Sequence, residues 1–154
     1  MTRIKSSDYR TLAAFRYEIR KFLAFSEQAA RAAGIEPQQH QLLLAVRGLP
    51  DGKRPTIRTI AERLCVQHHT AVALVDKLEQ RGLVLRERAS KDRREVLLRV
   101  TPDGAAILRR LSVLHRQQLA SVGRSMVAAL TSLLDDNEAG AEALELDASR
   151  ARSA

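Results

Sequence analysis

Four consecutive polar residues stand where a short turn meets an amphipathic segment of the chain. A glutamine amide can form two hydrogen bonds with an adenine edge, and a neutral imidazole can donate or accept one. Adjacent histidines on a helix point about 100° apart, so they do not chelate one metal ion together, and we expect neither a metal nor a cofactor. The chemistry that these side chains offer is recognition through hydrogen bonds. They are Gln67, His68, His69 and Thr70.

A basic cluster surrounds these four residues in the sequence. Residues 53–99 hold twelve Lys and Arg against six Asp and Glu, a local net charge of +6 in a chain whose total is +8. Such a field attracts a polyanion, although the alternative is an ordinary solvated charged surface. Further residues are predicted to contact phosphates or groove edges or to support such contacts. They are Arg58, Thr59, Lys77, Arg88, Lys91, Asp92, Arg93 and Arg94, with Arg86 among the neighbouring cations.

The predicted loop at 89–94 has a basic tip. Arginine there suits a minor groove, whose narrow A·T segments attract guanidinium groups. We expect the Asp92 carboxylate to hold Arg94 in place through a bidentate hydrogen bond. All five aromatic residues lie between Tyr9 and Phe25, far from the basic cluster in sequence. Because single-stranded nucleic acid is usually gripped by aromatic stacking, duplex DNA is the favoured partner.

The segments around the polar residues predict two short helices and a hairpin. Thr59 is expected to cap the first helix, with Glu62 three residues later as in a capping box. The second helix is expected over 68–80, because its apolar residues recur at three- and four-residue steps. Two strands are expected at 83–88 and 95–100. This order of elements is that of a winged helix-turn-helix.

The predicted fold is therefore mainly α (α+β), a winged helix-turn-helix with flanking helices, and all 154 residues form one domain. The DNA-binding lobe is expected at 56–101. Long amphipathic segments flank it at 8–34 and 102–148, the second interrupted near Gly123 and Ser125. The lobe needs only part of their apolar area, so we expect them to form a homodimer interface. The alternative is that they pack on their own lobe.

The remaining features exclude several classes of protein. Cys65 is the only cysteine, which rules out an internal disulfide and favours the reducing cytoplasm. Its apolar neighbours predict a small buried residue rather than an exposed redox sensor. No stretch approaches the roughly 20 apolar residues of a membrane span, and no signal peptide is recognisable, so no membrane contact is expected. No nucleophile, phosphate-binding or paired-carboxylate pattern indicates an enzyme.

Four stretches of the sequence together resemble the MarR family of bacterial transcriptional regulators. They follow one another in the family's order, and the resemblance covers roughly residues 8–135. The family usually has Gly or a small polar residue where this chain has Cys65, and often a basic residue near Ala73. The four stretches are IAERL (60–64), TAVALVDKLEQRGLV (70–84), DRR (92–94) and LLRVTPDG (97–104).

The resemblance implies a homodimer that reads a pseudo-palindromic operator, most often as a repressor. It also implies release by a small aromatic or phenolic effector, although some family members sense oxidants through cysteine instead. We place His40 and His115 in the pocket for such an effector, although these two histidines could instead simply pack in the core. A different alternative for the whole protein is a winged module that binds an acidic protein partner and no DNA. The residues predicted for an effector pocket are Phe15, Ile19, His40, Leu44 and His115.

Overall fold

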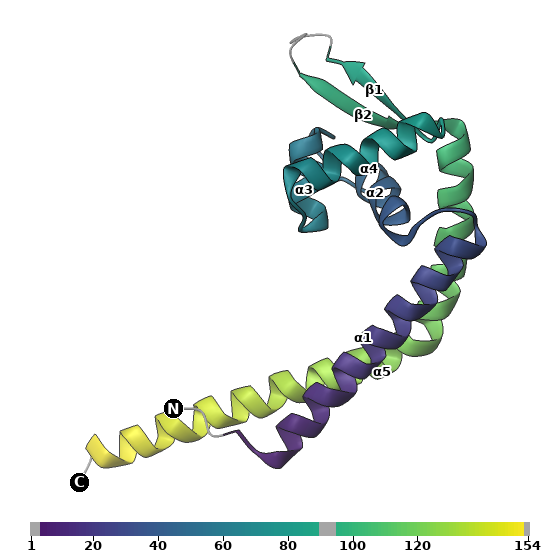
Figure 1. The fold of residues 1–154 in the computed structure, drawn as a ribbon. Coiled ribbons are helices and arrows are strands. Elements are labelled where there is room, and N and C mark those ends of the chain that lie inside the picture. Colours follow the sequence, from purple (N-terminus) through teal and green to yellow (C-terminus); the bar gives the residue numbers. More distant parts are fainter. Residues whose placement is uncertain (1–3, 90–94, 153–154) are drawn as a thin grey trace. The chain divides into compact units, whose positions relative to one another are not determined.

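A computed structural model of the chain describes the backbone of residues 4–89 and 95–152, with side chains in these ranges as far as Leu134 (Figure 1). These ranges contain five helices and one two-stranded antiparallel sheet, which confirms the mainly α winged-helix fold. The elements are α1 (Ser6–Ala32), α2 (Pro37–Arg47), α3 (Ile57–Leu64), α4 (His68–Gln80), β1 (Val84–Arg88), β2 (Val96–Val100) and α5 (Pro102–Arg152).

The chain divides into two compact units. One comprises the residues up to Phe25 and those from Arg116 onward, and the other comprises Ser26–His115. Helices α1 and α5 therefore each contribute to both units. The helix-turn-helix, the hairpin and the whole of α2 lie in the second unit, which we call the winged unit.

The core of the winged unit is built from the apolar faces of its helices and of the hairpin. Helix α4 contributes its inward-facing residues at three- and four-residue spacing, as its sequence predicts. Helix α2 packs against α3, α4 and β2, and α4 packs against β1. Buried contributors to this core include Leu42, Leu43, Ile60, Leu74, Val75, Leu78, Val84, Leu98, Leu108 and Leu111.

The cap of helix α3 differs from the prediction. The helix begins at Ile57, and Thr56 is its N-cap, whose hydroxyl accepts a hydrogen bond from the Thr59 backbone N–H at 3.1 Å. Thr59 instead lies within the first turn, where its own hydroxyl is 2.9 Å from that of Thr56. Threonine is a favoured N-cap residue, so the sequence offers both Thr56 and Thr59, and the prediction chose the wrong one.

The hairpin is joined tightly to the start of α5. In the register of the sheet, Val84 pairs with Val100 and Arg88 with Val96. The Thr101 hydroxyl donates to the Gly82 carbonyl at 2.7 Å and accepts from the Gly104 N–H at 3.1 Å, so it caps α5. A Cβ on Gly104 would lie 2.3 Å from the Leu83 carbonyl oxygen, which explains why glycine stands there.

Helix α5 is longer and more regular than predicted. It continues through Gly123 and Ser125 without the expected interruption and runs to Arg152. An isolated glycine costs a helix interior only about 1 kcal/mol, which the neighbouring turns readily offset. No helix among the residues that the structure describes is long and apolar enough to cross a bilayer.

Candidate nucleic-acid interface

The start of α4 presents the four polar residues much as the sequence predicts. Gln67 is the N-cap in extended conformation, and Gln67, His68 and His69 are exposed, whereas Thr70 is half-buried. Ala71, the next residue, is completely buried and anchors the helix in the core. The first turn of α4 therefore offers an amide and two imidazoles to solvent on a rigid support.

The start of α3 carries two further candidate residues, and one of them is less accessible than the sequence predicts. The Arg58 side chain is exposed and lies 3.4 Å from the Glu62 carboxylate, one helical turn away. Such an exposed pair contributes little to stability, so the guanidinium can exchange this partner for a phosphate. Thr59 is half-buried and its hydroxyl is engaged with Thr56. Of these two candidates, Arg58 is the more accessible.

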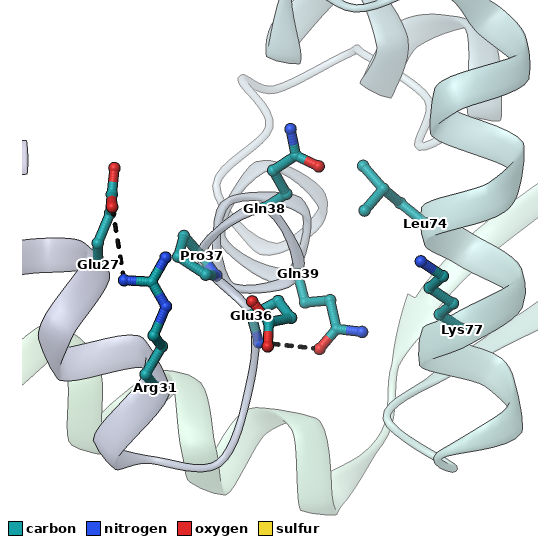
Figure 2. Close-up of a pocket in the computed structure, with 8 residues that line it drawn as sticks. All are labelled: Glu27, Arg31, Glu36, Pro37, Gln38, Gln39, Leu74 and Lys77. Atoms are coloured by element: carbon teal, nitrogen blue, oxygen red, sulfur yellow. Dashed lines mark hydrogen bonds and ion pairs between the residues drawn. The ribbon is translucent and has the colours of Figure 1, made fainter.

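Lys77 lies apart from the start of α4. It is nine residues after His68, which places it about 13 Å further along the helix axis. Its side chain lines a hollow of about 520 Å³ together with residues of α1 and α2 (Figure 2). Among the described residues, no other candidate for DNA contact lines this hollow. The lining residues are Glu27, Arg31, Glu36, Pro37, Gln38, Gln39, Leu74 and Lys77.

The hairpin places its described cations in two different environments. Arg88 is exposed at the end of β1, so its side chain is accessible to a binding partner. Arg99 on β2 is also exposed, but its guanidinium lies 2.5 Å from the Glu87 carboxylate across the hairpin. Four predicted contact residues lie outside the described residues, so the proposed Asp92–Arg94 brace stays a prediction. They are Lys91, Asp92, Arg93 and Arg94.

Arg86 is the residue whose role the sequence did not indicate. Its position in the sequence places it among the cations of the hairpin, yet its guanidinium forms ion pairs with both Asp76 and Glu79 of α4. Burial lowers the pKa of Arg86, but hydrogen bonds and charges from the two carboxylates raise it by more. The signal that was missed is the spacing of the two acids, which puts them on one face of the helix.

Arg81 also turns toward the protein. Its guanidinium donates to the Gly34 carbonyl at 2.7 Å and to the Gln39 side-chain oxygen at 3.0 Å. These bonds tie the end of α4 to the turn between α1 and α2. Helix α4 is thus held at its C-terminal end, while its N-terminal turn is exposed.

The predicted effector residues fall into both units. Within the winged unit, His40 is 3% exposed, and its ring centroid lies 4.9 Å from that of His115. Burial and the nearby His115 lower the pKa of His40 to about 4, and its Nδ1 has no hydrogen-bond partner among the described residues. Leu44 is exposed. Phe15 and Ile19 are half-buried in the other unit, and none of the five lines the hollow described above.

His115 has a defined hydrogen-bonding state. Its Nδ1 lies 2.6 Å from the Leu111 carbonyl oxygen and its Nε2 lies 2.8 Å from the Ser26 hydroxyl. Because a carbonyl only accepts, Nδ1 carries a proton, and in the neutral ring Nε2 accepts from Ser26.

The prediction that Cys65 is buried was wrong. The residue is exposed and ends α3 in the left-handed conformation, with φ 54° and ψ 41°. A left-handed C-terminal residue turns the chain sharply, so its side chain leaves the helix toward solvent and away from its apolar neighbours. No group of three or more metal-ligating side chains occurs in the described part of the chain.

Comparison with known proteins agrees with this geometry. The sequence model of the MarR family matches residues 33–95, which run from the end of α1 to the hairpin. The organic hydroperoxide resistance transcriptional regulator of Bacillus subtilis is 34% identical over 71 residues, 46% of either chain. The chain aligns with only about half the length of the curated relatives it matches.

Solved structures extend the MarR-family likeness to the fold of the remaining helices. AbsC of Streptomyces coelicolor, a MarR family transcriptional regulator, superposes with a TM-score of 0.65 over 100% of both chains at 18% identity. A point variant of S. aureus MepR bound to an oligodeoxyribonucleotide gives a TM-score of 0.58 at 23% identity, covering 79% of this chain and 93% of that one. These similar proteins are named as regulators rather than as enzymes.

Proposed function

We propose that this chain is a sequence-specific regulator of transcription that binds duplex DNA as a homodimer and acts as a repressor. The observation that carries the proposal is the exposed first turn of α4, where Gln67, His68 and His69 stand on a helix whose opposite face is buried. A helix of this kind fits the major groove, led by its N-terminal residues. The hairpin beside it then reaches an adjacent groove.

The MarR-family match supports this proposal. The matched segment contains α3, α4 and β1, the elements to which we assign DNA reading. A structurally similar protein is bound to an oligodeoxyribonucleotide, which shows that this fold accommodates DNA in that protein. The net charge of +6 on residues 53–99 supplies the attraction to phosphates that such binding needs.

The homodimer part of the proposal rests on the unit that contains most of α1 and α5. Large apolar side chains are exposed along both helices, an arrangement typical of a surface that a second copy covers. These residues are Tyr9, Leu12, Tyr17 and Leu23 of α1, and Leu119, Val127, Leu130 and Leu134 of α5.

Release by a small aromatic or phenolic effector is a further part of the proposal. The buried His40 imidazole, with its unpaired Nδ1 beside His115, offers one hydrogen-bonding atom to a hydroxyl-bearing ring. Titration with simple phenols and aromatic acids tests it. We expect one of them to weaken DNA binding by the wild type and not by a His40→Leu variant, and equal weakening of both would contradict this site.

The experiment that tests DNA binding is selection of bound genomic fragments, followed by titration of the selected site at several salt concentrations. We expect affinity to fall by about 0.9 log units per log unit of salt for each phosphate neutralised. The selected sites should contain two related half-sites in inverted order. Absence of binding at low salt would refute the proposal and favour an acidic protein partner.

A further inference from the structure

We propose that Arg86 is a positioning residue for DNA binding, which holds the hairpin at a fixed place on the reading helix without contacting DNA itself. The inference rests on the proposed function, because it assigns separate parts of one interface to α4 and the hairpin. It concerns three residues that the sequence did not connect, Arg86 of β1 and the acids Asp76 and Glu79 of α4.

The contacts are made by both the side chain and the backbone of Arg86. One guanidinium nitrogen lies 2.5 Å from a carboxylate oxygen of Asp76, and the other pairs with Glu79. The second oxygen of the Glu79 carboxylate accepts a hydrogen bond from the Arg86 backbone N–H at 3.2 Å. Glu79 therefore binds the backbone of β1 as well as the Arg86 side chain, and these two contacts fix where β1 lies along α4.

The two ion pairs of Arg86 with Asp76 and Glu79, which we call the brace, lie at the middle of the hairpin. Arg86 is the central residue of β1 and pairs with Leu98 of β2, whose side chain is buried in the core. The Arg86 side chain is 25% exposed. By comparison, the side chain of Arg99, which forms an ion pair with Glu87 in the same hairpin, is 63% exposed. A partly shielded guanidinium held by two carboxylates is screened less by water than an exposed ion pair.

The charges argue that Arg86 does not bind phosphate. With its two acids it forms a group of net charge −1, so a phosphate brought to this point would meet more negative than positive charge. The group instead keeps the hairpin in a fixed position relative to α4. The hairpin tip and the start of α4 must reach the duplex together, and a hairpin free to tilt would lose affinity by having to be ordered upon binding.

The test compares two variants that change net charge equally. Glu79→Ala removes the brace, whereas Glu87→Ala removes the acid that pairs with Arg99 within the hairpin. Each raises the net charge by one, so electrostatics alone predicts equal or tighter DNA binding for both. We expect Glu79→Ala to bind the selected DNA site about tenfold more weakly than the wild type, and Glu87→Ala to bind at least as tightly as the wild type.

A second readout does not depend on DNA. Spin labels at Gln80 and Arg88, in a chain with Cys65→Ala, report the distance between α4 and the hairpin. We expect the distance distribution to broaden in Glu79→Ala and to stay unchanged in Glu87→Ala. Unchanged distributions in both, or equal DNA affinities, would overturn the positioning role. If the wild type binds no DNA, the proposed function fails, and the distances still decide whether the brace exists.

A milder change keeps the test decisive if Glu79→Ala does not fold. Asp76→Asn replaces a half-exposed carboxylate by a group of the same shape and also raises the net charge by one. The same broadening and weaker DNA binding are expected at smaller amplitude, and binding as tight as that of Glu87→Ala would again refute the role.

Discussion

Acidification should destabilise the protein through His40. Its imidazole is buried, and its pKa is lowered to about 4 by burial and by the charge of His115, which faces it from α5. In the unfolded chain the same group takes up a proton near pH 6.5. The stabilising contribution is therefore fully present above pH 6.5 and is lost progressively as the pH falls toward 4. A lowering of this size corresponds to about 3 kcal/mol over the whole range.

The assay is urea unfolding of the wild type and of His40→Gln at a series of pH values. Between pH 7 and pH 5, the wild type should lose about 2 kcal/mol more of its free energy of unfolding than the variant does. His69→Gln, which alters an exposed histidine of the same unit, is the control and should follow the wild type. Parallel curves for the wild type and His40→Gln would refute the reasoning, because the carboxylates common to both contribute equally.

Two further predictions concern single backbone positions. Gly104→Ala should lower the free energy of unfolding by about 1–3 kcal/mol, because the new Cβ would meet the Leu83 carbonyl oxygen at 2.3 Å. Gly123→Ala, with nothing within 4 Å, should be neutral or stabilising, and equal losses in denaturant titrations would contradict this account. Cys65→Gly should raise the melting temperature and increase the free energy of unfolding by up to about 1 kcal/mol, because φ is 54° at this position. Cys65→Ala keeps that strained conformation, and an equal gain from Cys65→Ala would show that φ is not the cause.

The local elements were predictable because their signals are local. The apolar spacing of α4, the Thr101–Pro102 start of α5 and the order of helix, turn, helix and hairpin follow from neighbouring residues in the chain. The exposure of His68 and His69 follows in turn, since the opposite face of α4 must be buried.

What could not be predicted depends on contacts between distant residues or on backbone geometry. The spacing of Asp76 and Glu79 places both acids on one face of α4. Their pairing with Arg86 also requires the placement of β1 on α4, which that spacing does not contain. The exposure of Cys65 depends on a left-handed residue, whereas its apolar neighbours suggested burial. The continuity of α5 through Gly123 reflects many turns of helix acting against one weak breaker.

The most direct test of the account is DNA binding by a His68→Ala/His69→Ala variant, measured across a library of sites related to the selected one. We expect the variant to lose about 1–3 kcal/mol of discrimination for each base contact removed, while its affinity for random DNA stays near that of the wild type. Gln80→Ala, at the far end of the same helix, should leave the preferences unchanged. Identical site preferences in the wild type and the double variant would contradict base reading by the first turn of α4.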